Sequence, residues 1–160
     1  MGQYAEAGIE NVLALRGDPP GGPGTPWAAH PEGLDHAVEL VELVREAGDF
    51  CIGVAAFPTG HPESPSLEAD ARVLAAKQEA GASFAITQFF FRAEDWMRLR
   101  DRALAAGCDM PIVPGIMPIT SITQIARFAA LSGTEVPAEI TEQFAAIRSE
   151  EHTSELQSPC

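Results

Sequence analysis

The stretch Ser83–Phe91, SFAITQFFF, decides the fold. It follows Gly81, precedes the charged segment that opens with Arg92, and is apolar throughout except near its end. A continuous apolar run of this length is typical of a strand that is buried on both faces of a parallel sheet. Gln88 is the exception, because its amide carries two N–H donors and an acceptor oxygen that need partners. We expect Gln88 either to pair with a neighbouring backbone group or to face a ligand at the carboxyl end of the strand.

The same alternation of elements extends in both directions from this stretch. The chain begins in the end of a helix that stops at Gly8. Apolar runs with strand character begin near residues 9, 50, 83 and 110. Segments with helical spacing of apolar residues follow these runs, at residues 34–47, 67–80, 93–106, 121–131 and 137–147. Strands that alternate with helices indicate βαβ units and a parallel sheet, which places the chain in the α/β class.

Four such units make part of a (β/α)₈ TIM barrel, since a complete barrel takes about 250 residues. An open dinucleotide-binding sheet is disfavoured, because no glycine-rich phosphate loop follows the first strand. We therefore predict one partial barrel domain over residues 1–147. Residues 148–160 are polar and lack an apolar period, so we predict a disordered tail. This tail also resembles a translated sequencing adapter, and its His152 is excluded from the functional argument.

The composition excludes several classes of partner. A formal charge of −13 and a pI near 4.5 argue against nucleic acids and anionic membrane surfaces. The three cysteines form no disulfide framework, so a reducing cytoplasm is the predicted compartment. The sequence has no apolar run near the length of a membrane span, and no metal-binding spacing of cysteine or histidine.

Polar or glycine residues follow each of the four strand runs. Arg16 and Asp18 come after the first, His61 after the second, Gln88 near the end of the third, and Pro114-Gly115 after the fourth. Singly, each has a structural explanation: an Arg–Asp ion pair, a solvated histidine, a paired amide, a tight backbone contact. Because parallel strands end at one edge of the sheet, we expect Asp18, His61 and Gln88 to converge there. Together they favour a ligand site.

Five motifs carry a resemblance to a known family. In chain order they are ALRGDP at Ala14–Pro19, HPE at His61–Glu63, EAD at Glu68–Asp70, AITQFFF at Ala85–Phe91 and IVPGIMPI at Ile112–Ile119. Their order and spacing, from about Tyr4 to Ile140, resemble methylenetetrahydrofolate reductases. The resemblance implies a (β/α)₈ barrel that binds FAD, takes hydride from NADH or NADPH and reduces 5,10-methylenetetrahydrofolate to 5-methyltetrahydrofolate. It also implies a cytoplasmic protein of one-carbon and methionine metabolism, a homo-oligomer in its full-length form.

By position, the resemblance also assigns ligand contacts. The residues expected to contact FAD are Arg16, Gly17, Asp18, Ala37, Phe57, His61, Ser64, Asp70 and Lys77. Those expected to contact the folate are Asp18, Gln88, Gln124 and Phe128, with Gln88 facing the folate or the nicotinamide.

The chain also departs from the family pattern. Phe57 stands where a tyrosine often occurs, and Val73 and Ala76 replace polar or basic FAD contacts found in some members. The family's general-acid glutamate is expected upstream of Met1, so no catalytic residue is assigned within this chain. We therefore expect a fragment that is inactive alone. The alternative is a truncated barrel that is non-catalytic and retains no cofactor binding.

Overall fold

The computed structural model describes residues 2–17, 19, 25, 27–28, 30–131 and 134–156, with the side chains of 131 and 148–156 left out. The chain forms two compact units, which divide between Ile116 and Met117. The first unit holds the whole sheet, and the second holds two helices. Each unit is described by itself.

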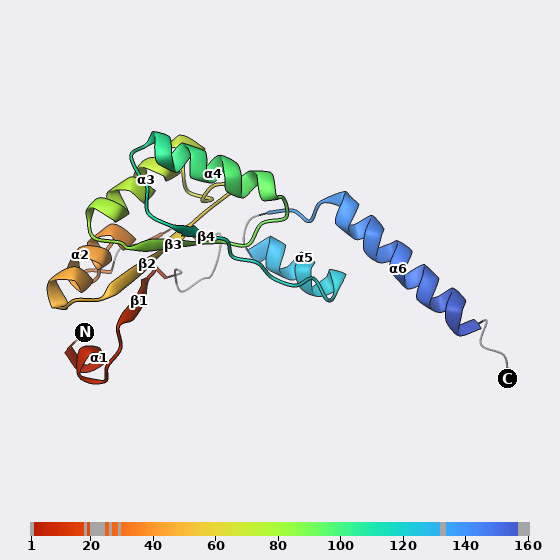
Figure 1. Ribbon diagram of the computed structural model, residues 1–160, viewed down its shortest axis with the longest axis horizontal. Helices are drawn as coiled ribbons and strands as arrows, with labels where there is room; N and C mark the ends of the chain where they lie inside the picture. The colour runs from red at the N-terminus through yellow and green to blue at the C-terminus, as the bar shows by residue number, and fades with distance from the viewer. Residues whose placement is uncertain are drawn as a thin grey trace. The chain divides into compact units, whose positions relative to one another are not determined.

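The sheet has four parallel strands in the order β1-β2-β3-β4, the order in which they occur along the chain (Figure 1). The strands are β1 (Asn11–Ala14), β2 (Cys51–Ala56), β3 (Phe84–Thr87) and β4 (Ile112–Val113). The helices of this unit are α1 (Gly2–Glu6), α2 (Ala37–Ala47), α3 (Leu67–Glu79) and α4 (Ala93–Ala105). The predicted α/β class is confirmed, and four successive parallel βα units are consistent with part of a TIM barrel.

The ends of α3 show how local sequence sets an element. Ser66 is the N-cap, and its Oγ accepts a hydrogen bond of 3.1 Å from the Ala69 N–H. This bond satisfies one of the N–H groups that a helix leaves unpaired at its start. Beyond the other end, Gly81 has a φ of +114°, a conformation that glycine adopts without steric cost. The chain can therefore turn sharply from α3 into β3.

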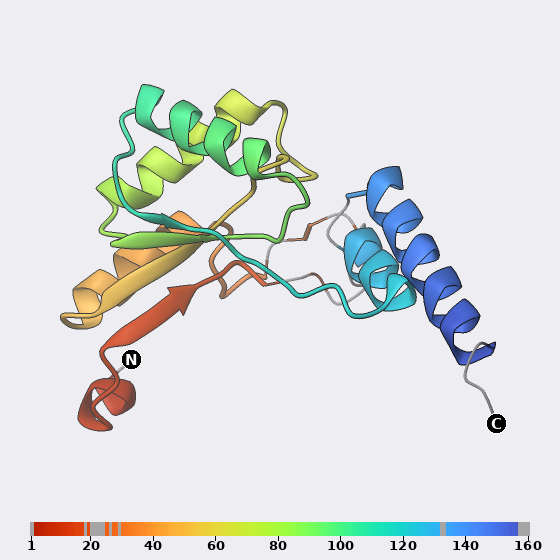
Figure 2. The ribbon, with the colours of Figure 1, turned by 45° about the vertical axis from the view of Figure 1, so that its right-hand side comes forward.

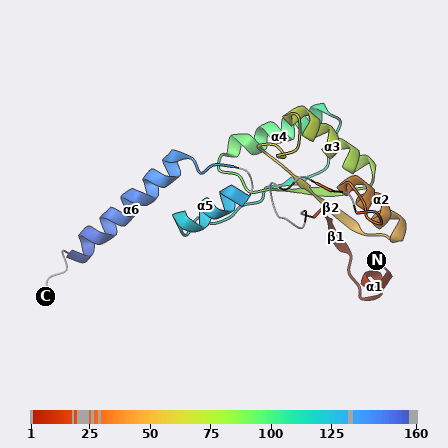
Figure 3. The same cartoon turned by 180° about the vertical axis from the view of Figure 1, so that it is seen from behind.

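Helices α2, α3 and α4 all pack on the same face of the sheet (Figures 1 and 2), and Figure 3 shows these three helices from behind. Ile52 and Val54 of β2 point into this layer and are fully buried. The helices contribute Val41, Val44, Leu74 and Leu99 to the same cluster. Each such side chain stabilises the fold by about 1.5–3 kcal/mol when fully buried.

The opposite face of the sheet is apolar but open in the part of the chain that the structure describes. Leu13, Ile86 and Val113 are 47%, 36% and 46% exposed. Phe84 lies across Gly53, where an added Cβ would come within 2.6 Å of the phenyl ring. The prediction that Ser83–Phe91 is a strand buried on both faces is therefore wrong. Helices cover only one face, and the strand ends at Thr87.

The second unit contains α5 (Ile122–Leu131) and α6 (Ala138–Leu156). Ile125 and Ala129 of α5 are buried and lie one helical turn apart. No break separates Ile147 from the residues after it, because α6 continues to Leu156. Residues 148–156 continue the helix, and the segment has no proline or glycine to stop it; the disorder predicted for residues 148–160 stays a prediction. Residues 157–160 lie outside the described residues, and the artefactual origin of the tail stays a prediction.

Gly115 provides a direct test of the packing between β3 and the segment after β4. A Cβ built on Gly115 would lie 2.1 Å from the Thr87 carbonyl oxygen, while the Gly115 N–H donates to Thr87 Oγ1 at 2.8 Å. Gly115→Ala must move backbone, so we expect a loss of about 1–3 kcal/mol or more in the free energy of unfolding. Urea denaturation measures it. The control, Gly2→Ala, meets no atom within 4 Å and should cost nothing; equal stability of both variants would contradict the close contact.

Truncation after Ile147 tests the independence of the first unit. That unit ends at Ile116, so removing residues 148–160 should leave its melting temperature unchanged. Thermal unfolding that is monitored by the aromatic circular dichroism of the first unit measures this melting temperature. A clear fall in the melting temperature would show that the end of α6 supports the sheet.

Candidate functional site

The loops that leave the four strands emerge at one edge of the sheet, because all four strands are parallel. Arg16 and Gly17 follow β1, His61 follows β2, and Gln88 follows β3 directly. The Gln88 N–H donates to the Ala56 carbonyl oxygen at 2.8 Å, which ties the ends of β2 and β3 together. Asp18 lies outside the described residues, so its predicted convergence with the others stays a prediction.

Arg16 pairs across two loops. Its Nη1 donates to Glu63 Oε2 at 2.6 Å, so the loop after β1 is joined to the loop after β2. The hydrogen bond from Arg16 holds the pKa of Glu63 below its usual value. The Arg16 Cζ lies 4.6 Å from the centre of the Trp27 ring. No pattern in the sequence selects Trp27 as a functional residue.

His61 is fixed by three neighbours. Its backbone N–H donates to Asp70 Oδ2 at 2.8 Å, and its Nδ1 accepts from the Glu63 N–H at 3.1 Å. The ring also meets Phe57 edge-on, with centroids 4.8 Å apart. Because Nδ1 is an acceptor here, a neutral His61 carries its proton on Nε2. Asp70, predicted to contact FAD, thus orients the His61 loop through its backbone.

Lys77 lies mostly inside the fold, although it is one of the residues expected to contact FAD. Its side chain is 8% exposed, and Nζ donates to the Ala55 carbonyl oxygen at 3.0 Å. Burial lowers the pKa of Lys77, and the negative charge of Asp70 opposes that shift. An ammonium group has three N–H donors, so two remain after the bond to Ala55. The contact with FAD that the resemblance implies for Lys77 stays a prediction; in the structure, its ammonium group bonds to the backbone of β2.

Gln88 is exposed, and its Oε1 accepts from the Phe89 N–H at 3.0 Å. This is the backbone pairing that the sequence analysis left open. The same hydrogen bond explains why β3 ends at Thr87. The side-chain amide of Gln88 supplies the acceptor for the Phe89 N–H that a neighbouring strand would otherwise provide. The Nε2 donors of Gln88 point away from that bond and remain for a ligand.

The other assigned residues are placed as follows. Ala37 opens α2, and Phe57 directly follows β2; both are half-buried. Ser64 lies in the loop before α3, and its Oγ donates to the Ser66 carbonyl oxygen at 3.1 Å. Gln124 and Phe128 are exposed residues of α5 in the second unit, where Thr120 Oγ1 donates to Gln124 Oε1 at 3.1 Å.

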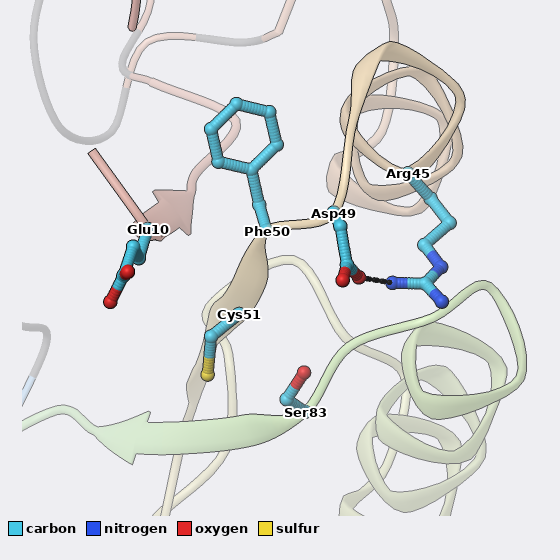
Figure 4. A pocket seen from close by; sticks show the side chains of 6 residues that line it. All are labelled: Glu10, Arg45, Asp49, Phe50, Cys51 and Ser83. Carbon is cyan, nitrogen blue, oxygen red and sulfur yellow. Dashed lines mark hydrogen bonds and ion pairs between the residues drawn. The ribbon is translucent and has the colours of Figure 1, made fainter. Parts of the chain in front are cut away.

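A hollow of about 430 Å³ lies at the opposite, amino edge of the sheet (Figure 4). It is lined by Glu10, Arg45, Asp49, Phe50, Cys51 and Ser83. Of its three charged residues, Arg45 and Asp49 pair with each other at 3.3 Å, and the third is Glu10. The hollow therefore does not coincide with the residues that the motifs select, and we place the candidate site at the carboxyl edge. Loops at that edge carry the ligand chemistry in parallel α/β folds.

The carboxyl edge has a donor set that fits an anionic cofactor. Arg16 keeps Nε and Nη2 free of hydrogen bonds to described residues, and His61 offers Nε2. Gly17 has a φ of +73°, and no atom of the described residues lies within 4 Å of a Cβ built on it, so these residues leave space for a ligand beside its backbone. No group of three metal-binding side chains occurs among the described residues, and no helix among them is long and apolar enough to cross a membrane.

Known proteins match this chain over most of its length. A family model described as methylenetetrahydrofolate reductase matches residues 1–157. The chain is 42% identical to the 5,10-methylenetetrahydrofolate reductase of Pectobacterium carotovorum subsp. carotovorum over 153 residues, 96% of this chain and 49% of that protein. This chain belongs to the methylenetetrahydrofolate reductase family.

Other members of the family match over similar lengths. Identity to the enzyme of that name from Escherichia coli (strain K12) is 41% over 153 residues, covering 96% of this chain and 49% of that protein. A Caenorhabditis elegans protein named probable methylenetetrahydrofolate reductase (NADPH) is 40% identical over 148 residues, 91% of this chain and 22% of its own length. The chain thus spans about half the length of its bacterial relatives.

The pH dependence of stability tests the burial of Lys77. Between its lowered pKa and the usual 10.5, the unfolded state binds more protons at this site than the folded state. Stability contributed by Lys77 must therefore rise with pH through that window. We expect wild type to gain stability relative to Lys77→Met as the pH rises toward 10.5, measured by urea denaturation. Arg72→Met, at an exposed position of the same helix, should show no such trend; a flat difference for Lys77→Met would contradict the burial.

Proposed function

We propose that the carboxyl edge of this sheet is part of an FAD and folate site in a flavin-dependent reductase. The reaction is reduction of 5,10-methylenetetrahydrofolate to 5-methyltetrahydrofolate, with NADH or NADPH as hydride donor. The observation that carries the proposal is the placement of Arg16, His61 and Gln88, each from a family motif, after the ends of three adjacent parallel strands. These three residues offer a cation, an imidazole and an amide.

The roles follow from the donors that each side chain retains. Arg16 provides Nε and Nη2 for the phosphate oxygens of a dinucleotide, a pairing for which the planar guanidinium is well suited. His61 can add a hydrogen bond from Nε2, since Nδ1 is already used. Gln88 presents its Nε2 donors to an acceptor of the folate or the nicotinamide, because Oε1 is held by Phe89. FAD, when bound, supplies the hydride chemistry, and the protein supplies binding and orientation.

Lys77 supports the alternative of a truncated barrel without cofactor binding, because its ammonium already serves the Ala55 carbonyl. The two proposals differ in a single observable property, the affinity of the protein for FAD. Catalysis does not separate them. We propose that the chain has no turnover alone in either case, since general-acid catalysis, typically worth about 10²–10⁴-fold, has no assigned residue here.

An FAD titration distinguishes them. We expect purified protein to quench FAD fluorescence with saturation, and Arg16→Met to weaken binding by about 10- to 150-fold, since a hydrogen bond to a charged group contributes about 1.5–3 kcal/mol. Arg45→Met is the matched control, because Arg45 lies at the amino edge beside Asp49 and should not affect FAD. Absence of saturable binding by wild type would favour the truncated barrel, whereas equal weakening by both variants would contradict the placement of the FAD site at the carboxyl edge. An assay of methylenetetrahydrofolate reduction should show no turnover.

A further inference from the structure

Trp27 belongs to no motif that marks the family, yet it meets the Arg16 guanidinium at the carboxyl edge. The Arg16 Cζ lies 4.6 Å from the centre of its ring, within the range of a cation–π contact. Trp27 is half-buried and lies in the segment between β1 and α2. The side chains of Arg16 and Trp27 are eleven positions apart, so the contact is made by the fold of this segment and not by neighbouring residues.

The other contact of Arg16 cannot fix the guanidinium by itself. Glu63 accepts one hydrogen bond, from Nη1, and both side chains are partly exposed. A single exposed ion pair contributes little, and it leaves the guanidinium plane free to rotate about that bond. A ring within cation–π distance of the guanidinium restricts this rotation. The bond to Glu63 uses Nη1 alone, so Nε and Nη2 stay available.

The indole nitrogen of Trp27 makes no hydrogen bond to the part of the chain that the structure describes. Trp27 Nε1 is buried and has no acceptor among those residues. A buried donor without an acceptor is unfavourable, and a purely structural position would be better filled by an apolar ring of similar shape. The interaction that favours tryptophan here is the contact between its ring face and Arg16, since tryptophan is the strongest cation–π partner among the aromatic residues.

We propose that Trp27 is a positioning residue, which holds the Arg16 guanidinium in the orientation that binds the anionic part of the ligand. This rests on the proposed function in one respect, namely that Arg16 binds FAD. Trp27 itself touches Arg16 and acts only through it. Trp27→Phe keeps a ring face and removes the unpartnered donor, whereas Trp27→Leu removes the ring.

The test compares FAD affinity in four variants. Trp27→Leu should weaken FAD binding about two- to fivefold, the equivalent of an exposed cation–π contact. Trp27→Phe should bind FAD within about twofold of wild type and melt at the same temperature or higher. In an Arg16→Met background, Trp27→Leu should cause no further loss, since the effect passes through Arg16. Wild-type affinity for Trp27→Leu, or an equal loss in the Arg16→Met background, would overturn the proposal.

A second readout needs no cofactor. The indole ¹H–¹⁵N signal of Trp27, assigned with Trp27→Phe, should shift in Arg16→Met, while the signal of Trp96, which donates to the Ile112 carbonyl oxygen, stays in place. An unmoved Trp27 signal would overturn the positioning role even if FAD binds normally. Wild-type protein that binds no FAD but shows the shift would overturn the proposed function and leave the contact between Trp27 and Arg16 established.

Discussion

The arrangement of the first unit depends on strand β2, which is paired along both of its edges. Ile52 and Val54 are buried under the helices, and the strand's backbone carbonyls accept bonds from three other parts of the chain. Ser83 N–H bonds to the Ile52 carbonyl at 2.7 Å, Lys77 Nζ to that of Ala55, and Gln88 N–H to that of Ala56. Because unpaired buried carbonyls are costly, β2 fixes the position of α3 and both ends of β3.

The two edges of the sheet are different kinds of surface. At the amino edge, Arg45 and Asp49 satisfy each other beside an open hollow. At the carboxyl edge, the side chains are joined by a chain of contacts from Trp27 to Arg16 to Glu63, and from the Glu63 backbone to His61. These contacts orient the donors without using all of them. An edge with oriented and partly unused donors is suited to binding a ligand, whereas a self-paired hollow is not.

The sequence was sufficient for the fold, because hydrophobic periodicity and strand–helix alternation depend on local spacing. It also predicted the edge of the sheet at which we propose the site. It was not sufficient for contacts between distant loops. The partner of Arg16 is Glu63, forty-seven positions away, and nothing in the local pattern indicates it or the ring of Trp27. The hydrogen bond from Lys77 to the Ala55 carbonyl depends on how deeply α3 packs. The end of β3 depends on a single hydrogen bond to the side-chain amide of Gln88. The helix through 148–156 shows that low apolar content does not by itself exclude helical structure.

The central claim is that ligand binding occurs at the carboxyl edge of the sheet and not at the hollow of the amino edge. Hydrogen–deuterium exchange of the backbone amides, with and without FAD, tests it most directly because both edges are observed in one experiment. The account predicts that FAD slows exchange in residues 57–64 and at Gly17, and leaves residues 49–51 unchanged. Slowed exchange at residues 49–51 with none at 57–64 would contradict it.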